Sequence, residues 1–546
     1  MLSGLIWLPI LGSLVVSIWP NPEQARRVAL VIALASLALC GLLLTQFDPS
    51  LANTQLSEIV PWMPELGLSY TLGVDGISLP LVVLNTVLVA VAIWGSSTRQ
   101  RQRLYYGLML LLGGAVTGAF LSQNLMLFFL FFEIELIPLY LLIAIWGGPR
   151  RGYASFKFLI YTAIAGILLL VGFFGMAFLG DAPGFDYAAL EGSSQSVSLQ
   201  VLLLIPILSG LAIKIPLVPL HTWLPDAHVE ASTPVSVMLA GILLKLGTYG
   251  LLRFGVQMLP DGWQVVAPWL AAIAVVNVIY GSLNALAQQD IKKIVAFGSV
   301  AHMGYVLLAA AAATPLSMVG AVFQMVSHGL ISALLFLLVG AVYANTGTRD
   351  LKLLRGLLNP ERGLPLVGSL MILGVMASAG TPGMVGFIAE FVVFRSSFEI
   401  FPLQTLLCMV GTGLTAAYFL LMVNRIFFGR LSSVAISMPR RTLTERLPAA
   451  VLALVVVILG LQPNWVVRWT EASAARMGSL VSHEGGFISS LTVVPQPLIP
   501  AWELTEPFLV ESLTKIDKRE VDLGISPGWQ SAPNEVEEKE PVVYLG

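Results

Sequence analysis

Several ionisable side chains lie in the middle of long apolar runs of this sequence. The set consists of Glu133, Glu135, Lys214, Lys245, His302, His328 and Glu390. Charged groups in membrane hydrocarbon cost at least about 2.5–3.5 kcal/mol each, so they are rare there and usually serve a function. Glu, Lys and His can each bind and release a proton, whereas Arg does not give up its proton. The residue types therefore predict an ion path through the membrane interior, most directly a path for protons.

The segment Ser209–Phe254 concentrates these features. It begins and ends as an apolar helix, and its middle contains Lys214 and Pro216. The polar residues that follow are His221, Asp226, His228 and Glu230, and Lys245 lies in the next apolar stretch. Irregular backbone at membrane depth is tolerated only where protein or a water-filled cavity surrounds it. We interpret the segment as a broken helix that forms one half of the ion path.

A second apolar run is interrupted in the same way. It contains Gly380-Thr-Pro382-Gly383, and Glu390 follows the interruption. Helices interrupted by Gly or Pro at matching places in two halves of a chain indicate a transporter's binding site. The alternative is that Pro216 and Pro382 only kink their helices.

Opposite charges suggest specific partners for the buried groups. We expect Glu133 to pair with Lys214, and Glu390 to belong to a matching site around His328. Glu135 follows Glu133 by two positions, about 200° around a helix, so it faces a different neighbour. The predicted relay is Glu133, Lys214, Lys245, His328 and Glu390, with His221, His228, His302 and Glu135 as secondary members.

Less specific interpretations remain open for these residues. Any single buried Glu or Lys is also compatible with a static ion pair that fixes helix packing, and Glu135 is equally compatible with a structural role. His221 and His228 are seven positions apart, which would place them on one helix face. They are candidates for core histidines, relay members or haem ligands.

The composition is that of a polytopic membrane protein. The 546 residues are 57% hydrophobic and 11% charged, and a soluble chain has about 25% charged residues. The net charge of −2 gives no indication of a nucleic-acid-binding surface. Cys40 and Cys408 lie in apolar runs without CxxC spacing, so we expect neither a disulfide framework nor a metal or iron–sulfur site. No glycine-rich fingerprint for a dinucleotide is present in a suitable context.

The apolar runs predict an all-α protein with about fourteen transmembrane helices. The polar stretch Phe47–Ser78 contains LSYTLGV and is compatible with a small β-hairpin. Basic residues concentrate in the first, third, fifth, ninth, eleventh and thirteenth connections, for example at Arg26, Arg101 and Arg150. By the positive-inside rule these odd-numbered connections are cytoplasmic, and both termini lie on the opposite side.

The predicted helices fall into five parts. Three N-terminal helices and the polar loop occupy residues 1–103, and two five-helix blocks occupy residues 104–256 and 264–430. The last transmembrane helix lies in residues 431–463, and a polar, acidic tail fills residues 464–546. The fourth helix of each block is broken, and the blocks start on opposite faces, which makes them an inverted repeat.

The same motifs carry a family resemblance. HTWLPDAHVEASTPVSVMLAGILLKLGTYG is supported by FFEIELIPLYLLIAIWGG, QDIKKIVAFGSVAHMGY, VSHGLISALLFLLVG and TPGMVGFIAEF. The chain resembles the antiporter-like, proton-translocating subunits of respiratory complex I. Within them it is most similar to the subunit 4 type of the type-1 NAD(P)H–quinone oxidoreductases, in the cyanobacterial and plastid branch. The resemblance covers roughly residues 70–430, and the acidic tail departs from the family pattern.

The resemblance implies roles, partners and a location. Glu133 stands at the fifth-helix glutamate of the family, Lys214 and Lys245 at the seventh- and eighth-helix lysines, and His328 and Glu390 at the eleventh- and twelfth-helix residues. The chain would carry no cofactor, with quinone (plastoquinone) and iron–sulfur clusters on other subunits. Partners would be other membrane-arm subunits, with antiporter-like subunits at both ends, and lipid. A cyanobacterial thylakoid or plasma membrane is the expected location.

Three functions are compatible with the sequence. The first is a proton-pumping subunit driven by NAD(P)H- or ferredoxin-dependent quinone reduction elsewhere in a complex, and the acidic tail suggests a variant linked to carbon dioxide uptake. The second is a subunit of a multisubunit sodium/proton antiporter. The third is a structural subunit that only buries ion pairs.

Overall fold

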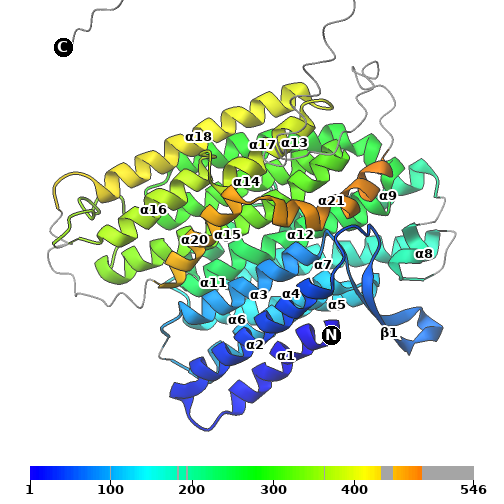
Figure 1. Ribbon diagram of the computed structural model, residues 1–546, viewed down its shortest axis with the longest axis horizontal. Coiled ribbons are helices and arrows are strands. Elements are labelled where there is room, and N and C mark those ends of the chain that lie inside the picture. The colour runs from blue at the N-terminus through cyan, green and yellow to red at the C-terminus, as the bar shows by residue number, and fades with distance from the viewer. Residues whose placement is uncertain (99, 181–183, 192–194, 362, 432–446, 482–546) are drawn as a thin grey trace, which may run out of the picture. The chain divides into compact units, whose positions relative to one another are not determined.

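The computed structural model describes residues 1–98, 100–180, 184–191, 195–361, 363–431 and 447–481. Three N-terminal helices lie beside one another, with a hairpin at one end of them (Figure 1). They are α1 (Leu2–Ile18), α2 (Ala25–Gln46, after the short helix η1, Pro22–Gln24) and α3 (Leu79–Trp94). Strands β1 (Gln55–Met63) and β2 (Leu68–Val74) pair antiparallel on either side of η2 (Pro64–Leu66), which confirms the predicted hairpin.

The first block consists of five helical units, the second and fourth of which are interrupted. The elements are α4 (Gln102–Leu121), α5 (Leu125–Ile134), α6 (Leu136–Trp146), α7 (Arg151–Leu179), the short α8 (Tyr187–Glu191), α9 (Val197–Lys214) and α10 (Trp223–Glu230). The fifth unit is continuous and combines α11 (Thr233–Met238), η3 (Leu239–Leu243), α12 (Leu244–Gly250) and η4 (Leu251–Gln257). Both η3 and η4 are π-helical, a geometry that is frequent at functional sites.

The second block repeats this order. Its elements are α13 (Pro260–Ala287), α14 (Ile291–Ala312), α15 (Pro315–Thr346), α16 (Pro365–Ser378), α17 (Val385–Ser397) and α18 (Pro402–Phe427). A proline opens four of these helices, where its missing N–H would have had no intrahelical partner. In both blocks the fourth unit is broken, between α9 and α10 and between α16 and α17, as the sequence predicts.

Apolar length supports a multi-pass membrane protein. Among the described residues, ten helices are long and apolar enough to span a membrane, or eleven if α20 (Leu447–Leu461) and α21 (Asn464–Ser479), bent by 64°, form one span. Helices α1, α3 and α16 are apolar but shorter. All the predicted apolar runs fall on helices, while the count of fourteen membrane crossings stays a prediction.

Contacts between connections sort them onto two faces. Leu72 of the hairpin forms a β-bridge with Ser122 in the connection between α4 and α5. Asn124 in the same connection forms a second β-bridge with Asp186, just before α8. On the other face, Arg26 donates a hydrogen bond to the carbonyl of Trp94, and Trp146 Nε1 donates one to Gln100 O at 2.8 Å. Even-numbered and odd-numbered connections therefore gather on different faces, and which face is cytoplasmic stays a prediction.

The predicted C-terminal tail differs from the structure in its first part. Residues Asn464–Ser479 form α21, which buries Val466, Thr470, Ala474 and Met477. Hydrophobic and small residues recur there at helical spacing, so this stretch packs as an amphipathic helix rather than as a polar arm. The rest of the predicted tail, residues 482–546, lies outside the described residues.

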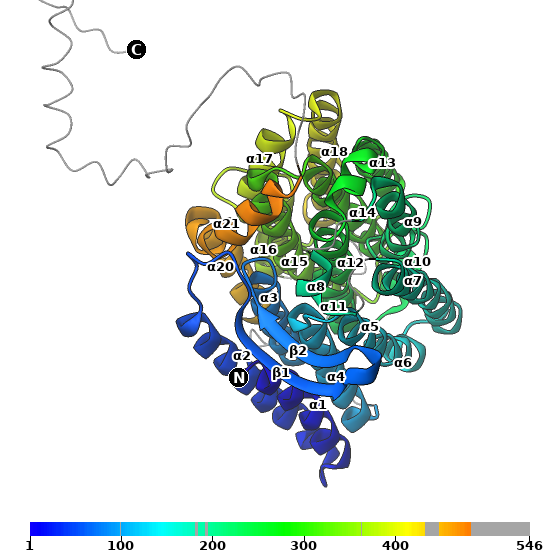
Figure 2. The ribbon, with the colours of Figure 1, turned by 90° about the vertical axis from the view of Figure 1, so that its right-hand side faces the viewer.

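Glycines allow the central helices to approach each other closely. A Cβ atom at Gly329 of α15 would lie 2.9 Å from the carbonyl oxygen of Gly241 in η3. A Cβ atom at Gly247 of α12 would lie 3.1 Å from Cβ of Lys214, at the end of α9. Figure 2 shows α12 and α15 in the interior, surrounded by other helices. These two close contacts bring the helices that carry Lys214, Lys245 and His328 together.

Candidate functional site

The first cluster of the site is an ion pair at the break of α9. Lys214 Nζ bonds Glu135 Oε1, and neither side chain is more than 1% exposed. Glu135 lies in the interruption between α5 and α6, where Pro138 cannot donate the hydrogen bond that Ile134 O would accept in a continuous helix. The Phe132 ring covers the ammonium group, with Nζ 4.3 Å from the ring centroid.

Glu133 lies beside this pair without joining it. The expected Glu133–Lys214 ion pair is wrong for this structure, because the Glu135 carboxylate takes that place. Glu133 Oε1 is buried without a hydrogen-bond partner among the described residues. The carboxylate lies over Gly166 of α7, where a Cβ atom would come within 1.9 Å of Oε1. Because Glu133 is only two residues from Glu135, the first cluster contains one lysine and two carboxylates, of which one is bonded to the lysine.

The second cluster joins Lys245 to His328. Lys245 Nζ lies 2.7 Å from His328 Nδ1 and donates a hydrogen bond to Ala240 O, also at 2.7 Å. Both side chains are buried, with exposed fractions of 0% and 5%. A hydrogen bond between two nitrogen atoms requires that one of them is unprotonated, so the pair shares a single proton along this contact.

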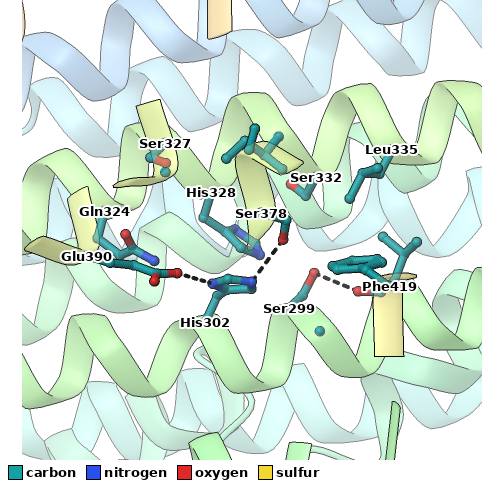
Figure 3. A pocket seen from close by; sticks show the side chains of 15 residues that line it. Ser299, His302, Gln324, Ser327, His328, Ser332, Leu335, Ser378, Glu390 and Phe419 are labelled. Atoms are coloured by element: carbon teal, nitrogen blue, oxygen red, sulfur yellow. Dashed lines mark hydrogen bonds and ion pairs between the residues drawn. The ribbon is translucent and has the colours of Figure 1, made fainter. Parts of the chain in front are cut away.

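His302 and Glu390 continue the cluster towards α17. The His302 and His328 ring centroids are 5.7 Å apart, and His302 Nδ1 lies 3.7 Å from Glu390 Oε1. His302 Nε2 lies 3.1 Å from Ser378 Oγ, and Thr412 Oγ1 donates a hydrogen bond to Glu390 Oε2 at 2.9 Å. Figure 3 shows His302 between Glu390 and Ser378. The structure therefore brings His328 and Glu390 into one cluster, with His302 between them.

A small polar cavity lies among these groups. Its volume is about 20 Å³, enough for about one water molecule. The polar side chains that line it are Ser299, His302, Gln324, Ser327, His328, Ser332, Ser378 and Glu390. Gln324 Oε1 is buried without a hydrogen-bond partner among the described residues. The cavity offers donors and acceptors along which a proton can pass between His328, His302 and Glu390.

The two clusters occupy corresponding places in the two blocks. In the first block, Glu135 from the second unit contacts Lys214 at the broken fourth unit. In the second block, His302 from the second helix contacts Glu390 after the break in the fourth. Lys214 precedes its break and Glu390 follows its own, which is the arrangement expected if the blocks have the opposite orientations that the sequence predicts.

The two histidines near the first break pack against aromatic rings. His228 of α10 stacks on Phe336 of α15, with ring centroids 4.5 Å apart, and neither ring nitrogen has a hydrogen-bond partner among the described residues. His221 precedes α10 and packs on Tyr280, 5.1 Å away. The expectation that both share a helix face is wrong, because the helix begins only at Trp223.

One buried ion pair was not predicted from the sequence. Arg253, on the same continuous helix as Lys245, forms an ion pair with Asp75 before α3, and its Nε donates to Tyr249 OH at 3.0 Å. The signal was present as an arginine within an apolar run. Its network continues through Gln257 and Glu191 to Arg476 of α21. This network ties the Lys245 helix to the hairpin face.

Metal ligation has no support in the described part of the chain. No group of three or more His, Cys, Asp or Glu side chains there is arranged to hold a metal ion. The site therefore consists of acid–base groups, serines and one amide within the described residues.

A fold of two inverted blocks around buried Lys, His and Glu residues defines an antiporter-like membrane subunit. The family described as NADH:quinone oxidoreductase/Mrp antiporter matches residues 122–415, so the chain belongs to this family. It is 43% identical over 440 residues to NAD(P)H-quinone oxidoreductase chain 4 1 of Synechococcus elongatus, covering 78% of this chain and 82% of that protein. It is 40% identical over 494 residues to chain 4 1 of a Nostoc species, covering 88% and 91%.

Solved structures share the fold. A chain of respiratory complex I from Thermus thermophilus superposes with a TM-score of 0.82 and 25% identity, covering 88% of this chain and 100% of that chain. A chain of the Mrp complex from a Dietzia species gives a TM-score of 0.80 with 23% identity, covering 87% and 97%. The second likeness shows the fold alone.

Proposed function

We propose that this chain moves protons across the membrane as a membrane-arm subunit of an NAD(P)H- or ferredoxin-dependent quinone (plastoquinone) oxidoreductase. The observation that carries the proposal is a series of neighbouring buried side chains. Lys245, His328, His302 and Glu390 follow one another in space from the first block into the second. Every member can bind and release a proton.

The two clusters have different tasks in this proposal. The second cluster conducts, because Lys245, His328, His302 and Glu390 follow one another with a polar cavity between them. The first cluster gates, because Lys214 bonds the carboxylate of Glu135, while Oε1 of the neighbouring Glu133 has no hydrogen-bond partner in the described part of the chain. A change in the pairing of Lys214 changes the electrostatic potential at Lys245, whose helix packs directly against Lys214.

The energies involved are of the right order. Two unit charges 4 Å apart interact by about 4 kcal/mol at an effective dielectric constant of 20. Moving one charge against 100 mV requires about 2.3 kcal/mol. The interaction energy of one buried ion pair is therefore of the same order as the work of moving one proton across the membrane. Quinone reduction on another subunit would supply this energy.

The relatives favour this setting over a sodium/proton antiporter. The similar curated proteins are named as NAD(P)H-quinone oxidoreductase chains, at 40% and 43% identity. Quinone and iron–sulfur clusters would then belong to other subunits, with antiporter-like subunits on both sides of this chain. We place the complex in a cyanobacterial thylakoid or plasma membrane, with a role in carbon dioxide uptake suggested by the acidic stretch 534–546.

Affinity purification of the intact complex tests this assignment. We expect quinone-reductase subunits to co-purify and vesicles containing the complex to acidify without sodium during quinone reduction. Co-purification of antiporter subunits alone, with sodium-dependent flux in the absence of quinone, would contradict the proposal and favour an antiporter.

A further inference from the structure

A large cavity opens on the face that carries the Arg-rich connections. Its volume is about 940 Å³, which is within the range of small-molecule sites. It lies where the N-terminal helices meet both blocks and α20, and α11, α16 and α20 each contribute lining residues. Its basic and aromatic lining residues include Arg26, Trp94, Tyr105, Trp146 and Arg151. None of the proposed relay residues lines it.

The polar part of the lining is basic. Arg26 and Arg151 both line the cavity, and no Asp or Glu is among its described lining residues. Arg26 uses one of its N–H groups for Trp94 O, and Arg151 Nη1 donates to Gly147 O at 3.4 Å. A guanidinium has five N–H donors, so both retain donors for an anion. The arrangement selects a negatively charged group with several acceptor oxygens.

The remaining walls are aromatic and apolar. The rings of Tyr105 and Trp146 meet edge to face, 5.1 Å apart, and Trp94 adds a second indole. Trp and Tyr are enriched at the level of lipid headgroups. Leu337, Leu338, Val367 and Ala449 form an apolar wall from α15, α16 and α20. An occupant must therefore be anionic at one end and apolar at the other.

We propose that this cavity binds the headgroup of an anionic glycerolipid. Its phosphate or sulfonate would lie against Arg26 and Arg151, and its chains along the apolar wall. The charge of the lining, the aromatic residues and the position at the helix ends favour a lipid over a polypeptide or a water-filled vestibule. Basic pockets between transmembrane helices recognise lipid headgroups in this way. The lipid would fix the N-terminal helices to the two blocks.

Native mass spectrometry of the purified complex tests the proposal. The complex is depleted of lipid and titrated with dioleoylphosphatidylglycerol, with dioleoylphosphatidylcholine or with inorganic phosphate. We expect retention of the anionic lipid only. The double variant Arg26→Gln/Arg151→Gln should bind it about 30-fold more weakly, since each Arg near a membrane surface contributes about a factor of five. Arg27→Gln is the matched control, because Arg27 is exposed and does not line the cavity.

Three results would overturn the proposal. They are equal retention of both lipids, an equal loss in the Arg27→Gln variant, and binding of inorganic phosphate as tight as that of the lipid. A photoreactive phenylalanine analogue at the lining position Ala344 gives a second readout. A crosslink to phosphatidylglycerol supports the lipid, whereas a crosslink to a polypeptide, or none, contradicts it.

Discussion

Lys214 bonds Glu135, whereas Oε1 of Glu133, two residues earlier, has no hydrogen-bond partner among the described residues. Glu135 is fully buried in the interruption between α5 and α6, while Glu133 is only partly buried and lies over Gly166 of α7. The two carboxylates therefore have different tasks. Glu135 holds Lys214 in place, and Glu133 is available as its alternative partner.

Replacing Glu135 by Gln should destabilise the protein. The change leaves the Lys214 ammonium buried without its carboxylate, and breaking a buried ion pair in this way costs about 3–5 kcal/mol. The thermal midpoint and the yield of the assembled complex measure this effect. An unchanged midpoint would show that Glu135 does not hold Lys214.

Replacing Glu133 by Gln should reduce proton pumping without destabilising the protein. No described hydrogen bond is lost at Oε1, so assembly and thermal midpoint should stay close to those of the wild type. Proton pumping should fall at least about tenfold, because the alternative partner of Lys214 is removed. Acidification of vesicles during quinone reduction is the readout, and normal pumping would remove Glu133 from the account.

Gly166→Ala probes the same carboxylate from the neighbouring helix. The added Cβ would lie 1.9 Å from Glu133 Oε1, so the carboxylate must move. We expect reduced pumping in an assembled complex. Gly152→Ala on the same helix is the matched control, since nothing lies within 4 Å of its Cβ position. Equal pumping by the two variants would contradict a requirement for this position of Glu133.

The sequence predicts the residue types and the helix breaks, but it does not predict the pairing. Charges in apolar runs and the Pro and Gly interruptions are visible in the sequence because a membrane tolerates neither without a reason. The choice of Glu135 over Glu133 depends on the interruption at Pro138 and on the closeness of Gly166, which are tertiary features. The sequence likewise predicts His302 only as a secondary relay member, because its contact with Glu390 depends on how α14 and α17 pack.

Glu58 on the hairpin should give a contact that responds to acid. Burial raises the pKa of Glu58, but hydrogen bonds from the Met1 amine, Ser3 and Leu2 outweigh it and lower the pKa to about 2. An unfolded Glu has a pKa of about 4.3, so the contribution of the carboxylate is complete above that pH and is lost as the pH falls towards 2. The protection of hairpin amides from hydrogen exchange, measured relative to the intrinsic exchange rate at each pH, should fall in that window. The Glu58→Gln variant should lack this pH dependence, and identical profiles would contradict the assignment.

The central claim is that a proton passes through Lys245, and Lys245→Arg tests it most directly. Arg keeps the positive charge but does not give up its proton. In vesicles containing the assembled complex, we measure proton uptake per quinone reduced for this variant and the wild type. We expect the variant complex to assemble and to lose the pumping that depends on this chain. Wild-type proton uptake by the Lys245→Arg complex would contradict it.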